Sequence, residues 1–238
     1  MIRVVRMSPR GVLRRSINGW NKHLARKLMP RLVRAASDAA ELRFLGEGDG
    51  AWPVLALPER AVCYCVGVGV NATFDLALAN RGHEVHSFDP TPRALEYAQR
   101  EQLDQRGLRF HPIGIWNEPK TLRFYAPSNR EYPNYSVVDL HGTGETIEAE
   151  CERLADVMQR LGHERIDLLK IDVEGSWGPI LDDMIASGIR PGQLCVEFDS
   201  PTSTLKMLRM IRKLEAAGYR VEWFERENFL FSRPEYRA

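Results

Sequence analysis

Acidic residues follow two apolar runs of this sequence, in a pattern that is typical of a catalytic cleft. The run 166–171 (IDLLKI) leads into Asp172 and Glu174, and the run 193–196 (QLCV) leads into Glu197. In open α/β sheets, ligands bind beyond the carboxyl ends of the strands, so we expect these side chains to point into one cleft. Neighbouring carboxylates push each other's pKa values apart, which is what a general acid–base pair requires.

Asp172 is the first candidate for a catalytic base, with Glu174, Glu197 and His141 as alternates. A simpler interpretation is that Asp172 or Glu174 caps the next helix, and that Asp199 caps the helix after it. Glu197 would be costly inside an apolar strand unless it is paired or faces the cleft. A divalent cation held by Asp172 and a neighbouring acid is a further alternative, although the sequence shows no complete set of metal ligands.

A glycine-rich turn follows the first predicted strand. Residues 66–72 (VGVGVNA) allow a tight turn and a close approach of the backbone to a ligand, and the helix after them would offer N–H groups to an anion. That anion would be the pyrophosphate of a dinucleotide or the carboxylate of S-adenosylmethionine. A plain strand-to-helix turn is the alternative interpretation.

Asp89 ends the second predicted strand, 22 residues after Gly67. A carboxylate at this place accepts hydrogen bonds from the ribose hydroxyls of a nucleoside cofactor. Because Pro90 follows it, Asp89 could instead open a turn and cap the next helix. The glycine-rich turn before it favours the ribose.

Strands and helices alternate along the part of the chain that carries these residues. Short apolar runs predict strands, and the amphipathic stretches between them predict helices. The alternation implies a parallel sheet with helices on both faces, while the last two strands are too close in sequence for a crossover and must form an antiparallel hairpin. The predicted fold class is α/β, a Rossmann-like, seven-stranded, mostly parallel sheet with a C-terminal antiparallel hairpin. The expected strands are 61–66, 84–88, 108–113, 166–172, 193–198, 219–224 and 228–232, and the expected helices are 72–81, 92–105, 151–161, 178–187 and 203–217.

Two regions of the predicted domain 46–238 fall outside this alternation. Residues 46–58 contain enough Gly and Pro for a connector or a cap. Residues 114–150 are interpreted as an insertion over the mouth of the sheet, with a strand at 121–125. Their aromatic side chains suit sugar binding, or they form the insertion's own small core. The candidate substrate-binding residues are Trp116, Tyr132 and Tyr135, together with Trp177 from the next part of the cleft.

Charge separates the start of the chain from the rest. The formal net charge of +1 conceals ten Lys/Arg and no Asp/Glu in residues 1–37, against 23 Lys/Arg and 32 Asp/Glu elsewhere. Apolar residues at helical spacing predict a basic amphipathic arm over 1–45, with a helix that ends at Pro30. We expect the arm to pack on the acidic body or on a second subunit, or else to lie on an anionic membrane surface. The acidic body argues against a nucleic-acid partner.

The cysteines indicate a reduced compartment, and the hydropathy of the sequence indicates that no segment spans a membrane. Cys63 and Cys65 should face the same side of a strand, and Cys151 and Cys195 have no partner pair for a zinc site. No apolar run approaches the roughly 20 residues that span a bilayer. We therefore expect a cytoplasmic protein with buried thiols, with peripheral membrane contact through the arm as the alternative.

Four stretches of the chain together resemble the FkbM-type methyltransferases, and the resemblance extends over about residues 48–232. It implies a class I methyltransferase fold, S-adenosylmethionine as cofactor, and methyl transfer to a hydroxyl of a sugar, a glycan or a small natural product. The stretches are 66–82 (VGVGVNATFDLALANRG), 85–95 (VHSFDPTPRAL), 166–175 (IDLLKIDVEG) and 193–198 (QLCVEF).

By this resemblance, Gly67, Gly69 and Asp89 match cofactor-binding positions, and Asp172 matches the acid that ends the fourth strand. The full set of candidate cofactor-binding residues is Gly67, Val68, Gly69, Asn71, Asp89 and Gly114.

Two positions depart from the family pattern. Trp177 stands where the family usually has a glutamate, and Asp199 stands where it often has a histidine. A catalytically silent cofactor-binding or scaffold protein is therefore an alternative function. An NAD-dependent oxidoreductase is another, which the terminal hairpin and the lack of a second catalytic domain disfavour.

Overall fold

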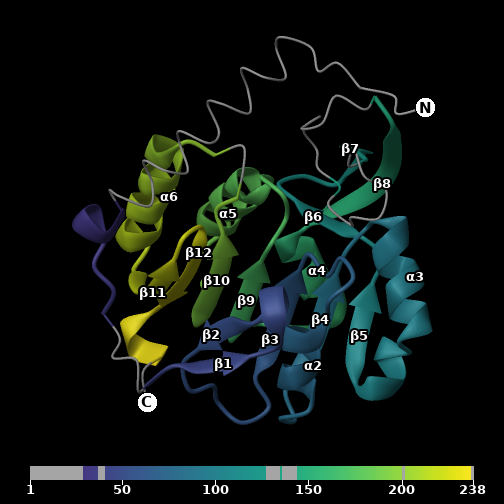
Figure 1. The fold of residues 1–238 in the computed structure, drawn as a ribbon, viewed down its shortest axis with the longest axis horizontal. Coiled ribbons are helices and arrows are strands. Elements are labelled where there is room, and N and C mark those ends of the chain that lie inside the picture. The colour runs from purple at the N-terminus through teal and green to yellow at the C-terminus, as the bar shows by residue number, and fades with distance from the viewer. Residues whose placement is uncertain (1–28, 37–40, 127–134, 136–143, 200–201, 237–238) are drawn as a thin grey trace, which may run out of the picture.

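A seven-stranded sheet forms the centre of the protein (Figure 1). The computed structural model describes residues 29–36, 41–126, 135, 144–199 and 202–236. The strands of the sheet are β3 (Val62–Val66), β4 (Glu84–Phe88), β5 (Leu108–His111), β9 (Leu168–Ile171), β10 (Gln193–Glu197), β11 (Arg220–Glu225) and β12 (Asn228–Ser232). They lie in the order β11-β12-β10-β9-β3-β4-β5.

The pairing of the strands confirms the predicted topology. β10, β9, β3, β4 and β5 pair in parallel, and β12 pairs antiparallel with both β10 and β11. The C-terminal hairpin is therefore present, with its second strand inserted between β10 and β11. Because the five parallel strands point the same way, all their carboxyl ends meet at one edge of the sheet.

Helices cover both faces of this sheet. One face packs against α4 (Leu154–Leu161), α5 (Trp177–Ala186) and α6 (Thr204–Ala216), and the other against α2 (Thr73–Ala79) and α3 (Pro92–Arg100). Side chains of β3 alternate between the two cores: Tyr64 enters the first, and Cys63 and Cys65 enter the second. All four cysteines are buried and free, as predicted.

Local capping explains where several helices begin and end. Thr91 caps α3 by accepting a hydrogen bond from the Ala94 N–H at 3.4 Å, and Ser203 caps α6 through the Lys206 N–H at 3.2 Å. The helix predicted over 92–105 ends at Arg100, because Gln102 adopts a left-handed conformation with φ 51°. Short 3₁₀ turns follow at η3 (Leu103–Arg106) and, near the C-terminus, at η4 (Pro234–Tyr236).

A small hairpin precedes β3 and packs on the face that carries α2 and α3. It consists of β1 (Arg43–Leu45), the 3₁₀ turn η2 (Gly48–Gly50) and β2 (Trp52–Val54). The buried side chain of Gln193 ties it to the sheet: its Oε1 accepts from the Leu55 N–H at 2.9 Å, and its Nε2 donates to the Leu55 and Ala56 carbonyls. The region predicted as a connector or cap is therefore a hairpin fixed to the sheet.

The insertion forms a second sheet at the end to which the parallel strands point (Figure 1). Its strands are β6 (Gly114–Trp116), β7 (Lys120–Tyr125) and β8 (Thr146–Arg153), in the order β6-β8-β7. β7 confirms the strand predicted at 121–125. The helix predicted over 151–161 begins only at Leu154, because residues 151–153 still pair with β6 and belong to β8.

The described part of the N-terminal arm packs on the domain. Residues 29–32 are helical, so the prediction that the helix ends at Pro30 is wrong. Proline disturbs the turn before it and leaves the residues after it free to remain helical. Met29 and Val33 are buried in the core that contains α6, and the Ala36 N–H donates to the Val221 carbonyl at 3.0 Å. Residues 1–28 of the arm lie outside the described residues. Among the helices that are described, none combines the length and the apolar character needed to cross a membrane.

Candidate functional site

A cleft of about 1080 Å³ lies at the carboxyl ends of β3, β4 and β9, between them and the small sheet of the insertion. It brings together nearly all the described residues that the sequence predicted for a functional site. Tyr132 and His141 lie outside the described residues. The predicted residues that line the cleft are Gly67, Val68, Gly69, Asn71, Asp89, Gly114, Trp116, Tyr135, Asp172, Glu174 and Glu197.

The glycine-rich turn forms one wall of the cleft and requires glycine at Gly67. The φ angle of Gly67 is +91°, and a Cβ atom added there would overlap the backbone oxygen of Asp172. An L-residue with a side chain would therefore be both strained and sterically blocked at this position. Close contact between the turn and the end of β9 brings the predicted cofactor-binding and catalytic segments together.

Asp89 fixes the conformation of this turn. Its Oδ2 accepts hydrogen bonds from the Val68 N–H at 3.0 Å and the Gly69 N–H at 2.8 Å. Its Oδ1 accepts from the N–H and the hydroxyl of Thr91, at 2.9 and 2.6 Å. The carboxylate is thus both at the predicted position and engaged by four protein donors. Binding of a ribose by Asp89 stays a prediction, and it requires that an oxygen be shared with these donors.

Asn71 connects the turn to the hairpin that carries η2. Its Oδ1 accepts from the N–H and the hydroxyl of Thr73, and its Nδ2 donates to the Glu47 carbonyl at 3.5 Å. The Asn71 side chain therefore forms a local turn with Thr73, the first residue of α2, and its contact with a cofactor stays a prediction. Residues 47–50 also line the cleft, a contribution that the sequence did not indicate.

Lys170 is a functional candidate that the sequence reasoning missed. It lies on β9 with an exposed fraction of 5%, and its Nζ donates to the Gly67 carbonyl at 2.9 Å and lies 3.3 Å from Asp172 Oδ2. Burial alone would lower the pKa of Lys170, but the charges of Asp172 and Asp75 outweigh it and raise the pKa above its usual value. A lysine inside the run LLKI was the available signal, because a buried charge needs a partner.

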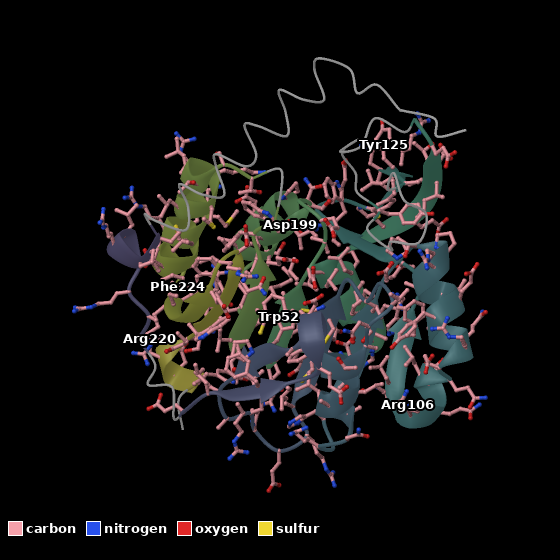
Figure 2. The ribbon with its side chains drawn as sticks, in the orientation of Figure 1. Trp52, Arg106, Tyr125, Asp199, Arg220 and Phe224 are labelled. Atoms are coloured by element: carbon pink, nitrogen blue, oxygen red, sulfur yellow. The ribbon has the colours of Figure 1, made fainter. Side chains whose placement is uncertain are left out.

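The ammonium of Lys170 also lies 5.9 Å from the centre of the Trp52 ring. This tryptophan is the first residue of β2, and Figure 2 labels it below Asp199. The charge of Lys170 is therefore held beside the glycine turn by an aromatic ring as well as by a carboxylate and the Gly67 carbonyl.

Asp172 and Glu197 form a hydrogen-bonded carboxyl pair in the cleft. Burial would raise the pKa of Asp172, but the Lys170 ammonium and hydrogen bonds from Glu197 and Lys170 lower it overall. Burial and then the charge of Asp172 raise the pKa of Glu197 to about 10. These opposite pKa directions favour a pair that shares one proton at neutral pH, with the proton mainly on Glu197 and the charge mainly on Asp172.

Glu174 and Asp199 extend this acidic group. Glu174 has a φ of +44°, and Asp199 Oδ1 accepts from the Gly175 N–H at 2.5 Å. Burial and the charge of Glu174 raise the pKa of Asp199 well above its ordinary value. The capping interpretation of Asp199 is wrong, since Ser203 caps α6. Figure 2 shows Asp199 at the upper edge of the main sheet, beyond β10.

Trp177 is the described candidate that the structure does not bring to the cleft. It begins α5 with an exposed fraction of 0%, its ring packs edge-on against Phe198 with centroids 4.8 Å apart, and Lys206 lies over its other face. The prediction that it walls the cleft is wrong, because the first turn of α5 directs this side chain into the core. Trp116 and Tyr135 do line the cleft.

The main sheet is parallel except for β12, which lies antiparallel between β10 and β11, and a glycine turn follows β3. This arrangement defines the class I methyltransferase fold. The model of the methyltransferase FkbM domain matches residues 63–221, about two thirds of the chain. The chain belongs to this family.

Curated relatives share the same region. The human "probable methyltransferase-like protein 24" is 27% identical over 139 residues, and its rat counterpart is 27% identical over 138 residues. Each match covers 57% of this chain but only 31% and 32% of the relative, so the chain matches just under a third of their length. Among solved structures, the methyltransferase FkbM of Methylobacillus flagellatus KT aligns with 75% of this chain and 45% of its own, at 13% identity and a TM-score of 0.49.

Proposed function

We propose that this chain is an S-adenosylmethionine-dependent O-methyltransferase that acts on a hydroxyl of a sugar, a glycan or a small natural product. Family membership supports methyl transfer as the class of reaction. The observation that carries the proposal is the placement of an ionised carboxylate, Asp172, directly beside the glycine turn in one cleft. We propose S-adenosylmethionine as the cofactor and a hydroxyl as the acceptor because the sequence resembles this family.

The residues present fit this cofactor. Gly67 lets the turn lie directly against the end of β9 in the wall of the cleft. The cleft is large enough for a nucleoside cofactor and a small acceptor. Gly67, Gly69 and Asp89 would hold it, with Asn71 keeping the turn in place. Bound S-adenosylmethionine supplies an activated methyl group on a positively charged sulfur, and the carboxylates of the cleft suit that charge.

Asp172 would orient the acceptor hydroxyl and take its proton. A hydroxyl proton becomes strongly acidic as its oxygen forms a new bond to carbon, so even a carboxylate with a lowered pKa can accept it. Protonated Glu197 donates a hydrogen bond to Asp172, and Lys170 fixes the side chain from below. The expected contribution of the protein is orientation of the acceptor and removal of this one proton.

The acceptor would lie under the insertion. Trp116 and Tyr135 line the same cleft as Asp172 and present aromatic surface, which suits the faces of sugar rings. Specificity for the acceptor is therefore assigned to the insertion, while Asp172 and the glycine turn serve the reaction itself.

Calorimetric titration with S-adenosylmethionine and, separately, with NAD tests the cofactor. We expect binding of the first and none of the second. Transfer of labelled methyl groups to a panel of mono- and disaccharides and hydroxylated small molecules then tests the reaction. Binding without transfer to any acceptor would support the silent cofactor-binding alternative, and binding of NAD alone would support the oxidoreductase.

Asp172→Asn tests the assigned base. We expect turnover to fall by about 10²–10⁴-fold while the affinity for S-adenosylmethionine changes little, because the cofactor contacts the turn. Asp182→Asn is the matched control, since Asp182 lies on the outer face of α5 and pairs with Lys213. Unchanged turnover in Asp172→Asn would remove this residue from the mechanism.

A further inference from the structure

Two histidines and a glutamate converge beside the first three residues of β4, outside the cleft. His86 Nε2 lies 3.3 Å from Glu84 Oε1, and His163 Nε2 lies 3.6 Å from the same oxygen. The three potential ligand atoms all lie within 4.8 Å of one another. None of these residues lines the cleft, and Glu84 begins the strand that Asp89 follows, about 16 Å away at the usual rise per residue.

We propose that Glu84, His86 and His163 form a binding site for a divalent transition-metal ion, with Zn²⁺ as the best fit. Imidazole nitrogens and a carboxylate oxygen are ligands that this ion accepts. Bonds of about 2.0–2.1 Å in a tetrahedral arrangement place ligand atoms about 3.3–3.4 Å apart. The separations of the two Nε2 atoms from Glu84 Oε1, 3.3 and 3.6 Å, are close to that value.

The second ring nitrogen of each histidine supports the same assignment. His86 Nδ1 lies 2.9 Å from His111 Nε2, and His163 Nδ1 lies 2.7 Å from the Tyr64 hydroxyl. Metal-bound histidines commonly donate their other ring N–H to such a partner, which fixes the tautomer and turns the free nitrogen toward the metal. In the tautomer that carries its hydrogen on Nδ1, each histidine would donate to this partner and leave its Nε2 free to bind the ion.

Burial of the ligands favours a defined site over a chance surface cluster. The exposed fraction of the His86 side chain is 1%, that of His163 is 12%, and that of Glu84 is 36%. His86 is fixed in the sheet between Tyr64 and His111. His163 directly follows Gly162, which ends α4 in a left-handed conformation. Glu84 leaves one side of the group open to solvent, which provides the path of entry for an ion.

The guanidinium of Arg109 now contacts the same group. Its Nη1 pairs with Glu84 Oε1 and lies 3.2 Å from His86 Nε2, so a positive charge lies against two of the three ligand atoms. The Arg109 side chain is 60% exposed and can move into solvent. An ion at the site would displace it, and Arg109 therefore competes with the metal.

Bound metal would join two separate parts of the fold. Glu84 and His86 belong to β4, and His163 belongs to the loop after α4, 77 residues later in the chain. A ligand that binds only the folded state raises the free energy of unfolding. The expected role of the ion is therefore to stabilise the attachment of α4 to the sheet, independently of methyl transfer.

Titration of the chelator-treated full-length chain with Zn²⁺, in competition with a chromogenic chelator, tests the proposal. We expect one Zn²⁺ per chain with micromolar or tighter affinity, and a rise of the melting temperature with Zn²⁺. Glu84→Gln and His163→Ala should each weaken binding at least tenfold. These two variants avoid the fully buried His86, and circular dichroism checks that they fold.

Two further variants separate this site from adventitious binding. Arg109→Gln should bind Zn²⁺ at least threefold more tightly, because the competing cation is removed. His83→Ala should leave the affinity unchanged, since His83 lies one residue away from Glu84 but contacts the Ala61 N–H instead. Absence of stoichiometric binding in both wild type and Arg109→Gln would overturn the proposal. Binding that is insensitive to Glu84→Gln and His163→Ala would overturn it equally.

Discussion

Gly67 is required both for the conformation of the glycine turn and for its contact with Asp172 in the cleft. We expect Gly67→Ala to lower the free energy of unfolding by about 3 kcal/mol or more, because the new Cβ adds strain at a positive φ and overlaps the backbone of Asp172. Binding of S-adenosylmethionine should be lost as well, since the turn must shift. Urea unfolding and calorimetry measure the two effects.

Gly82 offers a matched control for this prediction. Its φ is +82°, and a Cβ atom there would meet nothing within 4 Å. Gly82→Ala should therefore cost only about 1 kcal/mol, the conformational part of the penalty, and leave cofactor binding intact. Equal effects of the two substitutions would show that contact with Asp172 has no special role.

Glu197 makes stability depend on pH above neutrality. Its pKa is raised to about 10 in the folded protein, against about 4.3 in an unfolded chain. Between these values the folded state retains a proton that the unfolded state has released, so the free energy of unfolding falls as pH rises, by at most about 1.4 kcal/mol per unit. Glu197→Gln should reduce that slope.

Unfolding by urea at pH 6.5, 7.5 and 8.5 measures the slope. At the acid end of this window, His86 adds a slope of opposite sign, because its pKa is lowered to about 4 from about 6.5 in the unfolded chain. The difference in slope between wild type and Glu197→Gln is therefore the quantity to compare. Asp199 contributes in the same direction as Glu197, so the slope should shrink in Glu197→Gln and not vanish. Identical slopes in the two proteins would contradict the shared proton.

At the residue scale, the sequence predicted which acids meet in the cleft but not how they are held. Asp172 and Glu197 follow from the rule that strand ends meet at one edge. The rule does not show which distant groups a buried charge contacts, so the pairing of Lys170 with the Gly67 carbonyl does not follow from it, although a lysine within an apolar run signals that some partner is needed. Trp177 was misplaced because the direction of a side chain in the first turn of α5 depends on packing against Phe198.

Among the elements, the hairpin of β1 and β2 depends on one side chain of β10. Gln193→Leu would leave the buried Leu55 N–H and the Leu55 and Ala56 carbonyls without their partner, so we expect a loss of about 2–4 kcal/mol in the free energy of unfolding. Affinity for S-adenosylmethionine should also fall, because the same hairpin carries residues 47–50 of the cleft.

Gln99→Leu is the control, because Gln99 is exposed on α3. It should change the free energy of unfolding by less than about 0.5 kcal/mol. Thermal and urea unfolding of both variants measure the loss of stability, and calorimetry measures the loss of affinity for S-adenosylmethionine. A Gln193→Leu protein as stable as the control would contradict the anchoring role of this side chain.

Strands and helices with a clear hydrophobic periodicity are predicted well by the sequence, but the residues at which the helices begin and end are not. Every strand of the main sheet was expected near its observed place, since alternation and apolar runs report burial directly. The sequence predicts a helix from residue 151, because residues 151–153 carry no local strand signal, whereas pairing with β6 holds them in β8. Long-range pairing of this kind overrides local propensity.

For the molecule as a whole, the basic arm of residues 1–37 is predicted to contact either the acidic domain, a second subunit or an anionic membrane. Residues 29–36 already belong to the domain through Met29 and Val33, so an informative truncation removes residues 1–28 and no more. We expect this truncation to remove self-association or binding to anionic vesicles, because it removes eight Lys/Arg and no acid.

Size-exclusion chromatography and vesicle sedimentation compare the truncated and full-length chains. A change in size alone would favour contact with a second subunit, and a loss of vesicle binding would favour the membrane surface. If neither differs, packing of the arm on its own acidic body is the interpretation that survives.

The position of β12 has a consequence for the order in which the molecule folds. β11 has β12 as its neighbour in the sheet, and β12 in turn pairs with β10, which precedes it by some 30 residues. Closing the short turn between β11 and β12 costs little entropy, whereas closing the loop back to β10 costs more. The hairpin should therefore form first and dock as a unit, which makes completion of the sheet a late step that waits for residues 228–232 to be synthesised.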